Sequence, residues 1–274
     1  MVIDAHVHFW KYSKEDLPWI DRDMKILQKD YLPTELELTL HRNHVDGCIA
    51  VQAATEEVET RFLAELANTH PVIKGVVGWT DLRASNVEKK LSELKEYPSI
   101  KGIRHIVQSE PDDFLYDENF RAGVSLLKEF GYTYDILIYP RQLKAAVDFV
   151  RAFPDQVFIL DHSAKPDVKN KEMDMWKKGI TDLAMFPNVS CKLSGLITEA
   201  AWKEWSPAEF YPYLDVVFQA FGVERLMFGS DWPVMLLSGI YVQWKSLLEK
   251  YMEKHLQEEK DAVFGLNAQR IYGF

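Results

Sequence analysis

Two features that many proteins rely on are scarce or absent in this sequence. Cysteine occurs only twice, as Cys48 and Cys191, so there is neither a disulfide framework nor the paired spacing of a zinc finger. Both cysteines lie inside apolar segments, and we expect two buried thiols because free cysteine is usually buried. No uninterrupted apolar run reaches the length of about 18 residues that a membrane-spanning helix needs.

Basic residues are also in deficit. The chain has 32 Lys and Arg against 42 Asp and Glu, a net charge of −10. Nucleic-acid binding needs clustered basic side chains to displace counterions from phosphates, so this balance argues against it. The first residues lack the basic and apolar regions of a signal peptide. We therefore expect a soluble, cytoplasmic protein without nucleic-acid or membrane partners, and the sequence is compatible with a homodimer.

What the sequence does contain is a repeated alternation of short apolar runs and longer helical stretches. The runs are Val2–His8, Gly47–Ala53, Val72–Trp79, Ile100–Val107, Tyr132–Ile138, Val157–His162, Val189–Ser194 and Arg225–Ser230. Several are apolar on both faces, as parallel strands covered by helices on both sides must be. Eight such units favour an α/β fold in which residues 1–274, as one domain, close into a (β/α)8 TIM-type barrel. An open, doubly wound sheet is the structural alternative.

The helical stretches carry recognisable start and stop signals. Arg61–Ala67 and Val87–Leu94 each place their apolar residues along one stripe. The segment from Ser206 to Glu209 has the pattern of a capping box with proline in the first turn, and Gly222 supplies a stop. We therefore expect a helix between these last two signals.

The first run ends in two histidines. His6 and His8 are two residues apart, so on a strand both imidazoles point to the same face, which in a barrel is the interior. Two neighbouring imidazoles can ligate a metal ion or hydrogen-bond a substrate oxygen. The alternative interpretation is a pair of satisfied core histidines.

Later strand ends add further polar residues. The second run ends near Gln52, the fourth carries Arg104 and His105, and the sixth ends at His162. Asp231 follows the eighth run and comes shortly before a proline, so it is either a turn cap or a general base beside the histidines. In a parallel barrel these ends meet at one face, which is where such barrels place their active sites.

These residues belong to motifs that resemble those of a known family. The motifs are His6-x-His8, Asp30-Tyr31-Leu32-Pro33, Lys101-Gly102-x-Arg104-His105, Asp161-His162 with Lys165-Pro166, Lys192-Leu193-Ser194-Gly195, Met227-Phe228-Gly229-Ser230-Asp231-Trp232-Pro233 and Asn267-Ala268-x-Arg270-x-Tyr272. Together they resemble the amidohydrolase superfamily, and within it the branch of L-fuconolactone and L-rhamnonolactone hydrolases. The resemblance runs collinearly from residue 3 to residue 272.

The resemblance implies an amidohydrolase-like barrel that opens a sugar-acid lactone with water. It also implies metal ligation by His6, His8, His162 and Asp231, should one divalent ion be bound. The family's histidine at the end of strand five and its bridging lysine on strand four have no counterpart here, which argues against a binuclear site. One Zn or Mn ion and a metal-independent site both stay open, because some lactonases of this branch work without a divalent ion.

We expect Asp231 to be the general base that activates water for attack on the lactone carbonyl. His6, His8 and His162 would stabilise the oxyanion directly or through a metal ion. Arg104 and His105 are adjacent and cannot both face inward on a regular strand, so we expect a strand-end distortion that brings both to the substrate. The remaining expected contacts to the sugar are Gln52, Trp10, Trp79, Tyr139 and Trp232.

Two other functions compete with lactone hydrolysis. Decarboxylases of the same superfamily share the His-x-His motif and the late aspartate, but they rely on a complete metal site. A non-catalytic protein that binds sugar acids would bind lactone without turning it over.

Overall fold

The computed structural model describes all residues from Met1 to Phe274. Its strands are β1 (Ile3–Val7), β2 (Gly47–Val51), β3 (Ile73–Gly78), β4 (Ile100–His105), β5 (Thr133–Ile136), β6 (Phe158–Leu160), β7 (Val189–Leu193) and β8 (Leu226–Phe228). They form one parallel sheet in the order of the chain. The sheet closes where Val7 pairs with Trp232 and the backbone N–H of His8 donates to the carbonyl of Trp232 at 2.7 Å. The barrel prediction is confirmed, and the open-sheet alternative is wrong.

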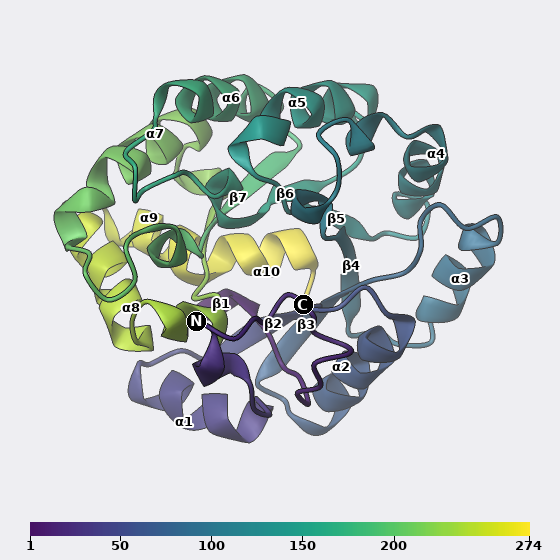
Figure 1. The fold of residues 1–274 in the computed structure, drawn as a ribbon, viewed down its shortest axis with the longest axis horizontal. Coiled ribbons are helices and arrows are strands. Elements are labelled where there is room, and N and C mark those ends of the chain that lie inside the picture. Colours follow the sequence, from purple (N-terminus) through teal and green to yellow (C-terminus); the bar gives the residue numbers. More distant parts are fainter.

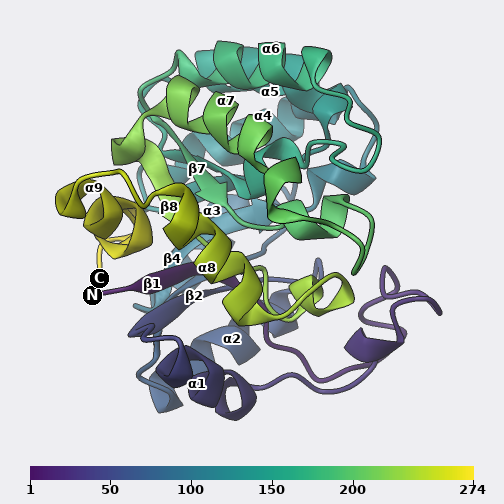
Figure 2. The same ribbon diagram turned by 90° about the vertical axis from the view of Figure 1, so that its left-hand side faces the viewer.

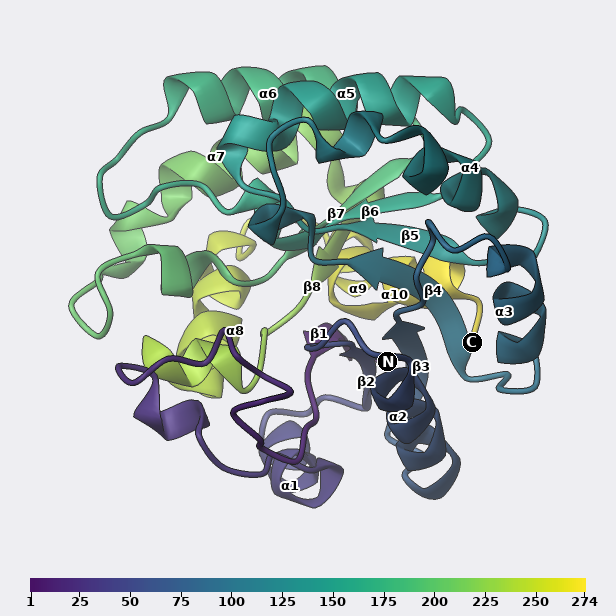
Figure 3. The ribbon, with the colours of Figure 1, turned by 45° about the vertical axis from the view of Figure 1, so that its right-hand side comes forward.

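Helices follow the strands and surround the barrel (Figures 1 and 3). They are α1 (Pro33–Arg42), α2 (Glu57–Thr69), α3 (Val87–Leu94), α4 (Glu118–Leu127), α5 (Leu143–Ala152), α6 (Asp174–Ala184), α7 (Tyr211–Phe221), α8 (Tyr241–Tyr251), α9 (Gln257–Asp261) and α10 (Asn267–Tyr272). The predicted capping box is present, because the Ser206 backbone N–H donates to Glu209 at 2.7 Å. It starts a short 3-10 turn before α7, and Gly222 at φ +66° ends that helix. No helix has the length and apolar character needed to cross a membrane.

The two ends of the barrel have different roles. Figure 2 shows both termini at one end and the loop between β1 and α1 at the other. At the terminal end, α10 lies across the barrel (Figure 1) and places Ala268 and Tyr272 against the interior residues Ile3, Ile49 and Met227. This apolar floor closes one end, so a ligand has access from the carboxyl ends of the strands, as the TIM-barrel architecture predicts.

A bulge in β1 determines which residues enter the barrel. The register of β1 against β2 shifts between Asp4 and Val7. Ala5 packs with the interior cluster, whereas Val7 packs with the outer layer between strands and helices. The carboxylate of Asp4 accepts from the hydroxyl of Tyr241 in α8 at 2.8 Å, so it faces outward. The extra residue of the bulge therefore turns His6 into the barrel directly above Ala5.

Candidate active site

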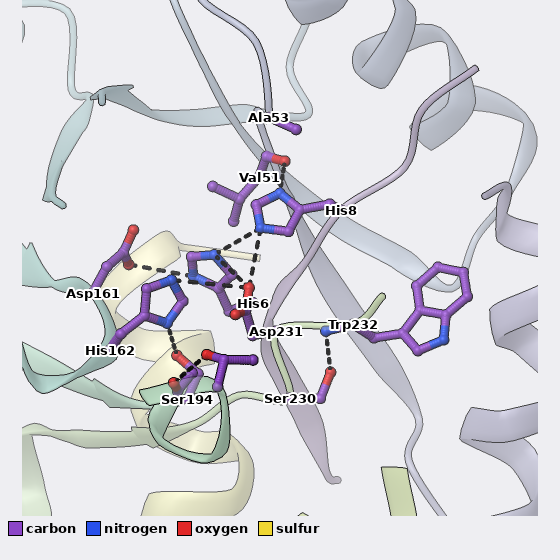
Figure 4. A network of polar contacts seen from close by, with 12 residues as sticks. His6, His8, Val51, Ala53, Asp161, His162, Ser194, Ser230, Asp231 and Trp232 are labelled. Carbon is purple, nitrogen blue, oxygen red and sulfur yellow. Dashed lines mark hydrogen bonds and ion pairs between the residues drawn. The ribbon is translucent and has the colours of Figure 1, made fainter. Parts of the chain in front are cut away.

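Four of the predicted residues converge at the carboxyl end of the barrel (Figure 4). Nε2 of His6 lies 3.3 Å from Nε2 of His8. Oδ1 of Asp231 lies 3.2 Å from Nε2 of His8 and 3.8 Å from Nε2 of His6. Nε2 of His162 lies 3.9 Å from the same oxygen. The carboxylate of Asp231 thus has three imidazole nitrogens around one of its oxygens.

Strained backbone aims two of these side chains. Residues His162–Lys165 all have positive φ, between +49° and +57°, and Asp231 has φ +62°. Left-handed backbone costs a non-glycine residue about 1–2 kcal/mol, so such a run persists only where neighbouring contacts impose it. The N–H of Lys165 donates to the carbonyl of His162 at 2.8 Å, and the N–H of Asp231 donates to the carbonyl of His6 at 2.9 Å. These contacts fix the backbone from which the side chains of His162 and Asp231 project.

The ring nitrogens of His6 and His8 and the carboxylate oxygen of Asp231 fit the coordination of one divalent ion. Nδ1 of His8 contacts the carbonyl of Val51 at 2.8 Å, and Nδ1 of His6 lies 3.3 Å from Oδ1 of Asp161. The carbonyl contact places the ring hydrogen of His8 on Nδ1, so the Nε2 lone pair of His8 faces Oδ1 of Asp231 at 3.2 Å. Two acceptor atoms at this distance repel one another unless a proton or a metal ion lies between them. Tetrahedral zinc with bonds of about 2.0–2.1 Å separates its ligands by roughly 3.3 Å, close to the separations found here.

Beneath His6 lies a fully buried ion network. Nζ of Lys192 contacts Oδ2 of Asp135 at 2.5 Å and Oδ1 of Asp161 at 3.0 Å, and it lies 3.3 Å from Nδ1 of His6. The hydroxyl of Tyr272 in α10 donates to Asp135 at 2.8 Å. Since Lys192, Asp135 and Asp161 are all 0% exposed, each charge depends on the others for compensation.

Arg104 brings a second buried cation to the site. Its Nη1 lies 2.9 Å from Oδ2 of Asp161 and 3.3 Å from Nε2 of His6. Its Nη2 donates to the carbonyl of Gln52, whose side-chain amide donates back to the carbonyl of Arg104 at 3.2 Å. Both oxygens of Asp161 are thus bound to cationic side chains. A second group of donors, which includes Asp161 and His6, is therefore less free to take up a metal ion.

Burial and neighbouring charges set the protonation of the site. Burial lowers the pKa of His162 to about 4 and holds the pKa of His6 well below 6.5. Burial alone would raise the pKa of Asp231. The neighbouring imidazoles oppose this shift: His162 and His6 through the positive charge that they can take up, and His8 through its hydrogen bond. The pKa of Asp231 is therefore well below its usual range. At neutral pH, Asp231 is ionised, while His6 and His162 are neutral.

His105 faces away from this group. Its Nε2 contacts Glu110 at 2.9 Å, its Nδ1 accepts from Nε1 of Trp79 at 3.1 Å, and its ring stacks on Phe114 with centroids 4.9 Å apart. The expected strand-end distortion is wrong, because β4 pairs with β5 in continuous register. Alternation along a regular strand puts Arg104 inside the barrel and His105 outside it. Trp79 is hydrogen-bonded to the outward-facing histidine.

The predicted aromatic residues divide between a packed wall and an open cleft. Trp10 and Trp232 are 3% and 5% exposed and pack edge-on against Tyr31. Figure 4 shows the side chain of Trp232 pointing away from the imidazoles. Tyr139 instead lines a cleft of about 770 Å³ at the ends of β5, β6 and β7. Among the predicted aromatic residues, Tyr139 is the one that lines this cleft.

No role was predicted for Asp135, Lys192 or Tyr272, nor for the cleft residues Lys165 and Glu199, although Lys192, Tyr272 and Lys165 lie in the motifs that resemble the family. For the first two a signal was available, because a charged residue inside an otherwise apolar strand is rarely buried without a partner. Tyr272 gave no such signal, since only the folded chain brings α10 under β5.

The amidohydrolase family matches residues 3–274, and the chain belongs to that family. It is 40% identical to an L-fucono-1,5-lactonase of Burkholderia multivorans, with 98% of this chain and 95% of that protein aligned. It is 34% identical to an L-fucono-1,5-lactonase of Burkholderia ambifaria, with 98% and 94% aligned. A crystal structure of a Burkholderia multivorans amidohydrolase with bound zinc superposes with a TM-score of 0.95 at 39% identity, covering 100% of this chain and 99% of that one.

Proposed function

We propose that this protein hydrolyses sugar-acid lactones, the class to which L-fucono- and L-galactono-lactone belong. The observation that carries the proposal is the position of the Asp231 carboxylate, which three imidazoles surround at the open end of the barrel. The full-length similarity to two L-fucono-1,5-lactonases supports the same substrate class.

In the proposed reaction, Asp231 accepts a proton from water, and the oxygen of that water forms a bond to the lactone carbonyl carbon. In this proposal Nδ1 of His162 accepts from the hydroxyl of Ser194, 2.9 Å away, and the N–H at Nε2 stabilises the oxyanion. Collapse of the intermediate breaks the bond between the carbonyl carbon and the ring oxygen. The ring oxygen receives the proton from Asp231 and becomes a hydroxyl, and the new carboxylic acid releases a proton to solvent.

The buried cations hold the catalytic groups in this arrangement. Arg104 and Lys192 bind Asp161, which fixes Nδ1 of His6 and so directs its Nε2 toward Asp231. A single Zn or Mn ion held by His6, His8 and Asp231 would supply Lewis-acid polarisation of the carbonyl. The positive charge of Arg104 beside His6 provides electrostatic stabilisation with or without that ion.

The test is Asp231→Asn, assayed with a pH indicator over a panel of aldonolactones, because ring opening releases one proton. We expect a loss of about 10²–10⁴ in kcat, the usual contribution of a general base. Asp215→Asn is the matched control, since Asp215 is exposed on α7 and bonded to Tyr251. A folded Asp231→Asn protein with near-wild-type turnover would show that Asp231 is not the base.

The decarboxylase alternative gains no support from the site. Asp135, on strand five, is engaged by Lys192 and Tyr272 and does not face the donor group of His6, His8 and Asp231. Aromatic acids in the same panel test this alternative, since decarboxylation would release CO₂ from them.

A further inference from the structure

Lys165 and Glu199 form an ion pair that the proposed reaction does not use. Nζ of Lys165 lies 3.4 Å from Oε1 of Glu199, and the two side chains are 14% and 19% exposed. Both line the cleft of about 770 Å³ that also contains Tyr139, Thr198 and Trp202. Because both charged side chains are largely buried but line a cleft, the pair is positioned to contact a ligand in that cleft.

The pair is only partly satisfied within the chain. The ammonium of Lys165 makes no hydrogen bond to any other side chain or carbonyl, and its nearest aromatic contact is Tyr139, whose ring centroid lies 5.5 Å from Nζ. The carboxylate of Glu199 likewise has Lys165 as its sole charged partner. The pair therefore presents free donors and free lone pairs to the cleft.

The pair lies beside the reaction centre. Lys165 ends the left-handed turn that begins at His162, with its N–H bonded to the carbonyl of that histidine at 2.8 Å. Burial alone would lower the pKa of Lys165, but Glu199, Tyr139 and Asp231 raise it. Burial raises the pKa of Glu199, and the charge of Asp231 adds to that shift. Both side chains are thus within electrostatic reach of the proposed base.

We infer that Lys165 and Glu199 form a hydroxyl-binding subsite that reads the polyol chain of the substrate. The ammonium donates to one hydroxyl oxygen, and the carboxylate accepts from a neighbouring hydroxyl. Charge-assisted hydrogen bonds of this kind are stronger than neutral ones, and a site built to bond a hydroxyl rejects an analogue that lacks it. The inference rests on the proposed lactone hydrolysis and names which groups select the sugar.

The experiment compares one fully hydroxylated aldonolactone with its 2-deoxy and 3-deoxy counterparts. For each protein, kcat/KM for the full lactone is divided by kcat/KM for each deoxy compound. We expect this ratio to fall by about 10- to 100-fold in Lys165→Met and Glu199→Gln for at least one deoxy compound. Lys128→Met is the matched control and keeps the wild-type ratios, because Lys128 also pairs with a carboxylate, Asp155 at 2.9 Å, but is exposed and lies outside the cleft.

The outcomes separate the two proposals. Wild-type ratios in both variants, or equal losses on every lactone, would overturn the subsite. A wild-type protein that opens none of the lactones would overturn the proposed function instead. Glu199→Gln replaces one oxygen by an amide nitrogen and keeps the side-chain shape, so it carries the test alone if Lys165→Met does not fold.

Discussion

The buried ion network makes a quantitative prediction for Lys192→Met. Nζ of Lys192 lies between Asp135 and Asp161, and the side chain is 0% exposed. Methionine keeps most of the volume but leaves the two carboxylates without their shared cation. Breaking a buried pair in this way costs about 3–5 kcal/mol. For a chain of this size, that loss lowers the thermal midpoint by about 6–10 °C.

The loss caused by Lys192→Met depends on pH in a defined direction. Burial raises the pKa of Asp135 from 3.8 to about 6 even though Lys192 opposes the shift. A carboxyl group with a raised folded-state pKa stabilises the fold below its unfolded pKa, and this contribution is lost as pH rises through the folded pKa. Without Lys192 that folded pKa rises further. The destabilisation is therefore largest near about pH 8 and smaller near about pH 5, where Asp135 is protonated.

Chemical denaturation at both pH values measures this loss. The matched control is Lys245→Met, because Lys245 is also largely buried but pairs with Glu249, which is 49% exposed, so its loss stays below about 1 kcal/mol. The double variant Asp135→Asn with Lys192→Met regains part of the stability at high pH. A loss below about 1 kcal/mol in Lys192→Met, or one that grows as pH falls, would refute the reasoning.

Three further changes test other parts of the site. Tyr272→Phe removes the hydroxyl that donates to Asp135 and lowers the free energy of unfolding by about 1–3 kcal/mol. Tyr251→Phe is the control and has a smaller effect, because the Tyr251 hydroxyl bonds to Asp215 at the surface. Chemical denaturation measures both variants. Gly195 has φ +68°, and Gly195→Ala puts a Cβ 2.6 Å from Nδ1 of His162. We expect kcat to fall while the circular dichroism spectrum stays native. An unchanged kcat would contradict that contact. Zinc at about 100 times its Kd stabilises the wild-type protein by about 2.7 kcal/mol and does not stabilise His8→Asn. Thermal unfolding with and without zinc measures this difference. Equal shifts of the thermal midpoint in both proteins would place the ion elsewhere.

The sequence predicted the barrel and the meeting of His6, His8, His162 and Asp231 at one end of it. Each strand is a short run flanked by helical spacing, and His6 and His8 lie at the position where a parallel barrel gathers its functional groups. Alternation alone, however, would place Asp4 on the same face as His6. In the structure, the bulge in β1 turns Asp4 to the outside of the barrel. No residue of β1 predicts this change of the backbone.

The partners of the buried charges were out of reach for a different physical reason. Lys192 and Asp135 are far apart along the chain, and their contact depends on strand register, which periodicity does not determine. His105 shows the same limit. Its adjacency to Arg104 left two orientations open, and only the regular pairing of β4 with β5 decides between them.

The bond from Tyr272 to Asp135 also has a consequence for the order in which the protein matures. The floor of the barrel comes from a helix that is synthesised after every strand it covers. At about 5–20 residues per second, a ribosome that has added Lys192 reaches Tyr272 only after roughly 4–16 seconds. Until then Asp135 lacks the hydroxyl of Tyr272, and the strands lack the helix that covers their amino ends. The buried network beneath His6 is therefore completed late in synthesis, although His6 is among the first residues made.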